Sequence, residues 1–456
     1  MSALPELQRL LADAVTTDRD VLDSYRNDSG NWVAAGVPTA LARPRNVEQV
    51  QSLARWASEH RVPLVPRGAG TGVAGGASAV DGCVVVSFER MNAIVELNEP
   101  AMYAVVQPGV LNVELKRAAH DRGLWYPPDP SSYEISSLGG NVATNAGGFC
   151  CVKYGVTGDY VLGLEAVRAN GERFRTGGRC RKDVAGYDLT QLLVGSEGSL
   201  ALITEITLRL RRRPPLPSTL VALFGSLEAA GHATARIIRL LEPSLLEVMD
   251  RTALRAIEQH AKLGIDDDAA AMLVAQCDSG NAVELQHMRE ACEAADAQLV
   301  YATEDHDQSE LLLRARRLAY PAMEKLGSVV IDDISVPLPH LAEMFRRIEI
   351  VAGRHDVLVA TVAHAGDGNI HPLIVFDPRD ERSRARAQAV FDQLMREALD
   401  LGGTVSGEHG IGALKPDSLR RQLDPTCLDL HHAVKQAFDP LGILNPGKLL
   451  SRQGNQ

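Results

Sequence analysis

The stretch VPRGAGTGVAGGAS, residues 65–78, decides how the first part of the chain folds. From residue 70 it shows the spacing Gly-x-Gly-x-x-Gly, which also marks dinucleotide-binding loops that open a crossover helix. Such a crossover needs roughly 10–12 residues or more. Only residues 76–82 precede the next strand-like run, CVVVSF at 83–88, and they are too rich in glycine for a helix. The sequence therefore predicts a strand, a glycine loop and another strand, with backbone N–H groups free to surround a pyrophosphate. An ordinary hairpin loop is the alternative.

Composition places the chain among soluble globular proteins. Its 456 residues are 45% hydrophobic and 23% charged, and the length suits two or three domains. A net charge of −11 argues against nucleic acid or an anionic membrane as a partner. No apolar run approaches the ~20 residues of a membrane span, and residues 1–20 are typical of an amphipathic helix rather than a signal peptide. We therefore expect no integral membrane segment.

Cysteine usage indicates a reducing, cytoplasmic setting. The seven cysteines include no Cys-x-x-Cys spacing, so neither a disulfide scaffold nor an iron–sulfur site is expected. The adjacent pair Cys150-Cys151 is read as small packing residues beside a glycine turn.

Two further tracts extend the pattern of the glycine loop. PPDPSSYEISSLGGNVATNAGGFCCVKYG, residues 127–155, is rich in small side chains and exposed amides that suit close approach to a flat polar ring. RKDVAGYDLTQLLVGSEGSLALITEITLRL, residues 181–210, predicts a short helix, a glycine turn and an alternating strand.

These three tracts, in this order, resemble the FAD-binding PCMH-type domain of the vanillyl-alcohol-oxidase superfamily. The resemblance is strongest to its D-lactate, glycolate and D-2-hydroxyglutarate dehydrogenases, and it covers essentially the whole chain. It implies that residues 67–72 hold the FAD pyrophosphate, that a second group lines the flavin, and that a third lies at the adenine end. No His or Cys stands in the loop to link the flavin, so non-covalent FAD is expected. The cofactor-binding residues implied are Arg67, Gly68, Ala69, Gly70, Thr71 and Gly72 for the pyrophosphate, Ser137, Gly140, Asn141, Thr144, Asn145 and Gly147 for the flavin, and Glu197 and Ile203 for the adenine end.

The fold class expected is α+β, a two-subdomain FAD-binding domain followed by a cap domain. A boundary is placed at the proline pair 214–215, which gives domains at 1–213 and 214–415. The cap alternates strand-like runs with amphipathic helices such as residues 382–403, a pattern typical of an antiparallel sheet with helices. The segment 416–456 resembles the closing motif that returns to the FAD domain, where Asn445 is expected near the cofactor.

A predicted hairpin carries two histidines. In VATVAHAGDGNIHPLIVF, residues 359–376, Asp-Gly at 367–368 between alternating runs indicates a two-residue turn. Counting outward, His364 faces His371, and directly opposed residues place their Cβ atoms about 4.5–5.5 Å apart on one face. That spacing suits two imidazoles on one metal ion, whereas two half-exposed strand histidines would be the alternative.

The turn SGEHGIG, residues 406–412, offers Glu408 as a third ligand, and two histidines with a carboxylate leave coordination positions open. The family resemblance implies the same set, His364, His371 and Glu408, around a zinc, manganese or iron ion. It also implies His409 as the catalytic base and Asn369 as a substrate-binding residue.

An anionic substrate requires a cation, and the segment 311–327 offers several arginines. By position relative to the family's arginine we select Arg316 for substrate binding and catalysis, with Arg317 as the second choice. The 2-hydroxyglutarate members place a lysine just before the strand that here reads DISVP, whereas this chain has Ile331 and Asp332. The expected activity is therefore FAD-dependent oxidation of a small D-2-hydroxy acid, D-lactate or glycolate, to the 2-oxo acid, with hydride transfer to flavin N5.

Several alternatives stay open at this point. The chain could instead be a D-2-hydroxyglutarate dehydrogenase, a non-catalytic flavin-binding subunit of a glycolate oxidase-like complex, or a metallohydrolase. The electron acceptor is unidentified, and association with it could bring the protein to a membrane surface. A homodimer is one option for the oligomeric state.

Overall fold

The computed structural model describes residues 4–30, 32–265 and 268–450, which form two compact units. Unit 1 comprises Met1–Gly147, Val156–Arg213 and Glu408–Gln456, and unit 2 comprises Gly148–Gly155 and Pro214–Gly407. The chain leaves unit 1 at the proline pair. Residues 408–415, assigned by sequence to the second domain, belong to unit 1, and residues 148–155 belong to unit 2.

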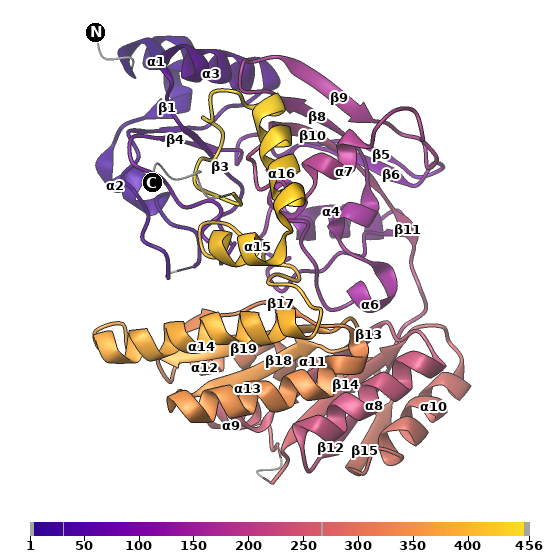
Figure 1. Ribbon diagram of the computed structural model, residues 1–456. Helices are drawn as coiled ribbons and strands as arrows, with labels where there is room; N and C mark the ends of the chain where they lie inside the picture. Colours follow the sequence, from indigo (N-terminus) through magenta and orange to yellow (C-terminus); the bar gives the residue numbers. More distant parts are fainter. Residues whose placement is uncertain (1–3, 31, 266–267, 451–456) are drawn as a thin grey trace. The chain divides into compact units, whose positions relative to one another are not determined.

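The first sheet of unit 1 contains the glycine loop. Its order is β1-β2-β4-β3, and helices α1 and α3 lie beside it (Figure 1). Both helices contribute apolar side chains to its core. Helix α3 begins where Asn46 accepts a hydrogen bond from the amide of Gln49 and ends at Arg61 in the left-handed conformation. The elements are α1 (Leu4–Leu11), β1 (Val15–Thr16), α2 (Arg19–Ser24), β2 (Ala40–Ala42), α3 (Val47–His60), β3 (Leu64–Arg67) and β4 (Val84–Ser87).

The strand–loop–strand prediction is confirmed, and no helix occurs in residues 68–83, all of which the structure describes. The hairpin alternative is wrong, because β3 and β4 pair in parallel with Leu64 opposite Val84. The loop therefore crosses over without a helix. Its length is sufficient for an irregular crossover, in which glycines at positive φ, including Gly70 and Gly75, turn the backbone.

The second sheet of unit 1 is antiparallel, with the order β5-β6-β10-β8-β9. The short helix and following strand predicted from residues 181–210 are confirmed as α7 and β10. The elements are β5 (Ile94–Asn98), β6 (Tyr103–Val106), α4 (Asn112–His120), β7 (Leu124–Trp125), α5 (Leu138–Thr144), β8 (Val161–Val167), β9 (Arg173–Gly177), α7 (Leu189–Leu193), β10 (Leu202–Arg209), β11 (Arg211–Arg212), α15 (Pro416–Gln422) and α16 (Pro425–Phe438).

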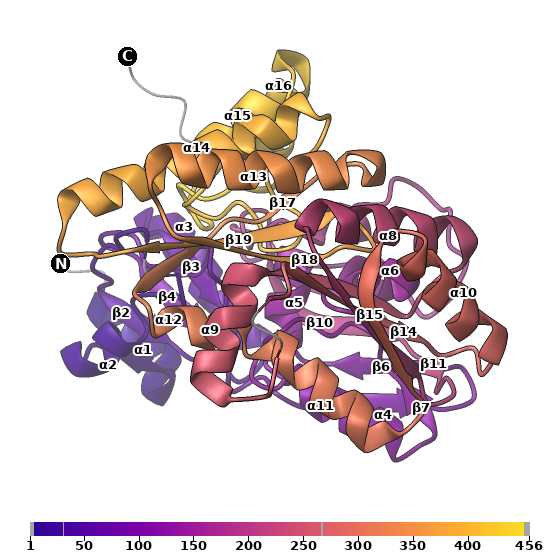
Figure 2. The ribbon, with the colours of Figure 1, turned by 90° about the horizontal axis from the view of Figure 1, so that it is seen from below.

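Unit 2 is an antiparallel sheet of eight strands between two helix layers, as expected for the cap. Helices α8, α10, α13 and α14 cover one face, and α9, α11 and α12 cover the other (Figure 2). The strand order is β15-β12-β14-β13-β18-β19-β16, and β17 also pairs with β19. The elements are α6 (Cys151–Tyr154), β12 (Ser218–Phe224), α8 (Leu227–Leu240), β13 (Leu245–Asp250), α9 (Arg251–Ala261), β14 (Ala271–Cys277), α10 (Ala282–Glu293), β15 (Ala297–Thr303), α11 (His306–Arg317), α12 (Ala319–Glu324), β16 (Ser328–Ile331), β17 (Ile334–Ser335), α13 (Leu341–His355), β18 (Val359–His364), β19 (Asn369–Phe376) and α14 (Glu381–Asp400).

Alternation along the central strands determines which side chains meet. On β18, Ala360 and Val362 point into the apolar core formed with α9, α11 and α12. His364 continues the same face, because side chains two residues apart on a strand lie on one side of the sheet. The candidate histidine therefore extends a hydrophobic surface rather than a solvent-facing one.

All seven cysteines lie among the described residues and are free thiols. None of the helices described is both long enough and apolar enough to cross a membrane.

Candidate functional site

In unit 1, the glycine loop is built around a buried guanidinium. Arg67, the last residue of β3, is only 9% exposed, and its Nη1 donates to the carbonyl of Asn27 at 2.7 Å. Gly70 has φ +78°, and a Cβ added there would overlap with Nη2 of Arg67. Burial lowers the pKa of Arg67, although not enough to remove its charge. The ring of Tyr25 lies 5.6 Å from the guanidinium carbon. A buried cation beside a glycine-rich backbone suits a pyrophosphate, so these residues fit FAD.

The second tract folds into α5, which is tied to the glycine loop. The side chain of Ser137 caps this helix by accepting from the amide of Gly140, and it also accepts from the amide of Ala69 at 3.2 Å. Asn141 is buried and bonds to the side chains of Asn112 and Ser136. Its amide is therefore occupied by the protein's own groups, which favours a structural role for that residue.

Two more residues of this tract also bond within the protein. Thr144 donates its hydroxyl hydrogen to the carbonyl of Gly140. Asn145 ends α5 in the left-handed conformation, and its side-chain oxygen accepts from the amide of Gly158 at 2.7 Å. These bonds fix the backbone of the tract.

The carboxylate of Glu197 holds the turn that follows His409. Its two oxygens accept from the amides of Ile411 and Gly412, both at 2.7 Å. Burial is the largest effect on its pKa and raises it to about 7. Asn445 donates to the carbonyls of Glu197 and Gly76, at 2.7 and 2.9 Å. The C-terminal segment thus joins the glycine loop and the third tract of unit 1. Ile203 is buried on β10 opposite Ala166.

In unit 2, His364 and His371 lie on the hairpin of β18 and β19, but their predicted pairing is wrong. His364 is opposite Asn369, and His371 is opposite Val362. The connection is a four-residue loop, 365–368, rather than a two-residue turn. The reason is non-local, because the amide of Gly366 donates to the carbonyl of Leu246 on the neighbouring strand β13 and extends the loop.

The shift of register by two residues keeps both histidines on one face. Their ring centroids are 5.1 Å apart and the rings are nearly perpendicular. Both side chains are buried, with 3% of His364 and 5% of His371 exposed. Two adjacent buried imidazoles provide the nitrogen donors that zinc, manganese or iron accepts, so this part of unit 2 fits a metal ion.

Arg316 lies in the last turn of α11 and is also buried, at 7% exposed. Its guanidinium lies 5.2 Å from the ring centroid of Phe149. Arg314 and Arg317 are exposed, and Arg317 pairs with Glu310 in solvent. Among these three arginines, Arg316 is therefore the one directed into the sheet.

The sequence analysis missed Glu247, on β13. Its carboxylate is fully buried, accepts from Arg316 Nε at 2.8 Å and lies 2.6 Å from His364 Nδ1. The signal was present in the sequence, because an acid in the middle of the apolar run LLEVMD, residues 245–250, requires buried partners.

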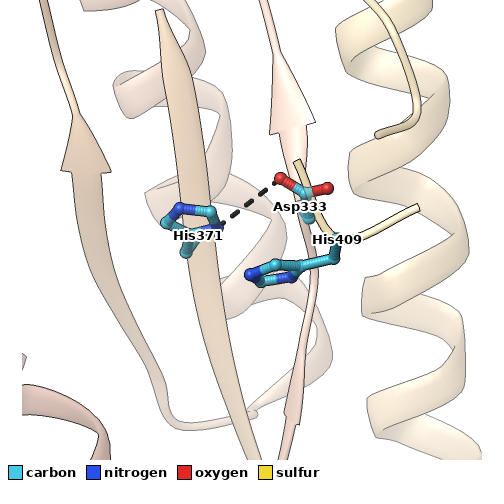
Figure 3. A group of neighbouring side chains, drawn as sticks. All are labelled: Asp333, His371 and His409. Atoms are coloured by element: carbon cyan, nitrogen blue, oxygen red, sulfur yellow. Dashed lines mark ion pairs between the residues drawn. The ribbon is translucent and has the colours of Figure 1, made fainter. Parts of the chain in front are cut away.

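Asp333 was likewise missed. Figure 3 shows its ion pair with His371, in which Oδ1 lies 3.6 Å from Nδ1. The same oxygen accepts from the side-chain amide of Asn369 at 2.8 Å, and the other oxygen accepts from the hydroxyl of Ser406 and the backbone amide of Gly407. Asp333 thus fixes Asn369 and the chain immediately before Glu408.

Glu408 and His409 are the first residues of the last segment of unit 1. The two side chains approach each other, with His409 Nε2 at 3.7 Å from Glu408 Oε1. A Cβ added to Gly147 would overlap with Oε2 of Glu408, so glycine allows the carboxylate to lie against the second tract. His409 keeps 23% of its side chain exposed, which leaves it accessible to a ligand.

The two-sheet unit that contains the glycine loop, followed by a helix-covered antiparallel cap, defines a PCMH-type flavoprotein fold. The solved structure of p-cresol methylhydroxylase with substrate bound matches it with a TM-score of 0.82 at 19% identity, over 100% of this chain and 97% of that chain.

Sequence models agree with the fold. The FAD binding domain matches residues 38–177, and the FAD linked oxidases C-terminal domain matches residues 213–449. The chain belongs to the FAD-linked oxidases and is an FAD-dependent oxidoreductase.

Similar curated proteins extend over nearly the whole chain. Glycolate oxidase subunit GlcD of Bacillus subtilis (strain 168) is 41% identical over 92% of this chain and 90% of its own. D-lactate dehydrogenase of Archaeoglobus fulgidus is 35% identical over 94% and 96%. D-2-hydroxyglutarate dehydrogenase of Stutzerimonas stutzeri (strain A1501) is 33% identical over 98% and 98%.

Proposed function

We propose that the protein oxidises a small D-2-hydroxy acid, D-lactate or glycolate, to the corresponding 2-oxo acid. The observation that carries the proposal is the buried group of Arg316, His364 and Glu247, in which a carboxylate-binding cation and a metal-binding imidazole share one acid. The names of three relatives, a glycolate oxidase subunit, a D-lactate dehydrogenase and a D-2-hydroxyglutarate dehydrogenase, support the same class of substrate.

Each residue has a defined task in this proposal. Arg316 binds the substrate carboxylate, because a guanidinium presents paired donors that match its two oxygens. Asn369 orients the substrate, and His364, His371 and Glu408 hold a divalent ion. When bound, that ion would lower the pKa of the substrate hydroxyl.

His409 accepts the hydroxyl proton on an imidazole nitrogen, a task for which the ordinary pKa of histidine is suited. The α-hydrogen leaves as a hydride, for which FAD, when bound, is the acceptor. The products are therefore a 2-oxo acid, one proton on the chain and the reduced cofactor. The glycine loop with Arg67 holds FAD non-covalently. Support for this loop and the neighbouring segments comes from Ser137, Glu197 and Asn445.

The charges beside His371 favour a monocarboxylate. Asp332 and Asp333 are both fully buried just before β17, and an acidic residue there would repel a second substrate carboxylate. D-2-hydroxyglutarate is the second candidate, supported by the relative of that name. The relative named as a subunit also supports a partner protein that receives the electrons.

Anaerobic reduction of the purified flavoprotein by D-lactate, glycolate and D-2-hydroxyglutarate tests the proposal, with metal analysis on the same sample. We expect D-lactate or glycolate to bleach the absorbance near 450 nm. We also expect that acid to have a higher kcat/KM than D-2-hydroxyglutarate. Preference for D-2-hydroxyglutarate would refute the monocarboxylate assignment. A flavin that stays oxidised with every acid would indicate a non-catalytic subunit.

A further inference from the structure

Glu247 is a fully buried acid of unit 2 that takes no part in the proposed reaction steps. It lies in the middle of β13 and is directly opposite His364 in the sheet. Leu245 and Met249, its neighbours on the same face of the strand, belong to the apolar core. An isolated carboxylate in such surroundings is strongly disfavoured. Its hydrogen bonds to Arg316 and His364 explain why it can be buried here.

We propose that Glu247 is a positioning residue that couples the two binding functions of unit 2. One oxygen orients His364 for the metal ion, and the other orients Arg316 for the substrate carboxylate. This inference rests on the proposed function, because it takes the ion and the hydroxy acid from it.

The hydrogen bonds determine which atom of each side chain Glu247 contacts. A carboxylate only accepts, so Nδ1 of His364 carries the hydrogen in the 2.6 Å contact with Glu247. The neutral imidazole then has its lone pair on Nε2, the nitrogen that would face the metal ion.

The same argument applies to the guanidinium. Arg316 uses Nε–H for Glu247, which leaves the hydrogens of Nη1 and Nη2 for a ligand. Phe149 restricts the remaining freedom, since its ring lies 5.2 Å from the guanidinium and 5.3 Å from the imidazole of His364. The acid and the aromatic ring therefore hold the cation and the imidazole as one assembly.

Substitution by glutamine distinguishes coupling from a purely structural role. Glu247→Gln keeps the size of the side chain but offers one acceptor oxygen to two donors, so either His364 or Arg316 must lose its partner. Glu247→Asp keeps both acceptors on a shorter chain. Asp250→Asn is the matched control, because Asp250 is also a buried acid of β13 but has Ala253 and Thr361 as its hydrogen-bond partners instead of His364 and Arg316.

The experiment measures Mn²⁺ affinity of the metal-free, FAD-loaded protein and the KM for D-lactate. Glu247→Gln is expected to weaken Mn²⁺ binding about 10- to 100-fold and to raise KM as well. Arg316→Lys should raise KM and leave Mn²⁺ affinity unchanged. Asp250→Asn should lower the melting temperature and leave Mn²⁺ affinity unchanged.

A Glu247→Gln protein that folds, binds FAD and keeps wild-type Mn²⁺ affinity and KM refutes the inference. If that variant fails to fold, Glu247→Asp decides, since coupling requires Mn²⁺ affinity and KM to worsen together. The double variant Glu247→Gln/Arg316→Lys should raise KM by less than the product of the fold-increases in the two single variants. An increase equal to that product counts against coupling. Failure of the proposed function would appear in the wild type, as no oxidation of any hydroxy acid, whereas the Mn²⁺ comparison would still test the link between Glu247 and His364.

Discussion

Replacing Gly70 by alanine tests whether the glycine loop depends on Arg67. The new Cβ would overlap with Nη2 of Arg67, and φ at this position is +78°. Gly82→Ala is the matched control, because Gly82 has φ +74° and no atom within 4 Å of the added Cβ. Both substitutions carry the backbone cost of a left-handed alanine, partly offset in the unfolded chain, and we expect Gly82→Ala to lower the free energy of unfolding by about 1 kcal/mol.

Gly70→Ala must in addition displace the guanidinium from the carbonyl of Asn27. A hydrogen bond from a charged donor contributes about 1.5–3 kcal/mol, so this variant should lose about 3 kcal/mol in total. Urea unfolding followed by tryptophan fluorescence measures the difference, because Trp32, Trp56 and Trp125 all belong to unit 1. FAD affinity should fall only in Gly70→Ala. Equal loss of stability in the two variants, with unchanged FAD affinity, would show that Arg67 moves without cost and does not hold the cofactor.

Three further changes test the remaining sites. His371→Ala should keep its flavin absorbance but lose bound metal and turnover; loss of flavin with metal retained would mean that the two sites are assigned the wrong way round. Arg316→Lys should raise the KM for the hydroxy acid at least tenfold, whereas Arg317→Lys, at an exposed position, should not. Equal effects of the two substitutions on KM in steady-state kinetics would contradict the assignment of Arg316. Because burial raises the pKa of Glu197 to about 7 from 4.5, the folded protein keeps a proton that the unfolded chain loses between these values. The free energy of unfolding of unit 1 should therefore fall by up to about 3 kcal/mol as pH rises from 5 to 8, and Glu197→Gln should flatten this profile in urea titrations.

The parts of the fold that depend on local pattern could be predicted from the sequence. Alternation in residues 202–210 and in the runs of unit 2 identifies β10, β12, β14, β18 and β19, and the absence of room for a helix after the glycine loop excludes a Rossmann crossover. The parallel pairing of β3 and β4 was not predicted, since strand direction depends on the path of the whole loop.

The register of the hairpin shows why the site could be predicted only in part from the sequence. Asp-Gly at 367–368 favours a two-residue turn, but the amide of Gly366 bonds to Leu246, more than a hundred residues earlier. Glu247 was missed for a related reason, because its significance depends on two partners, His364 and Arg316, on other elements. Residue types were legible in the sequence, whereas the pairs that they form were not.

The C-terminal segment has a consequence for synthesis of the protein. Leu64 of β3 donates to the carbonyl of Ile443, and its own carbonyl accepts from Asn445. The ribosome makes these partners about 380 residues later, which takes roughly 20–80 s at about 5–20 residues per second. Until then the edge of β3 stays open to pairing with other chains, so we expect unit 1 to mature only once residues 443–445 can pair with β3, and nascent chains to depend on chaperones.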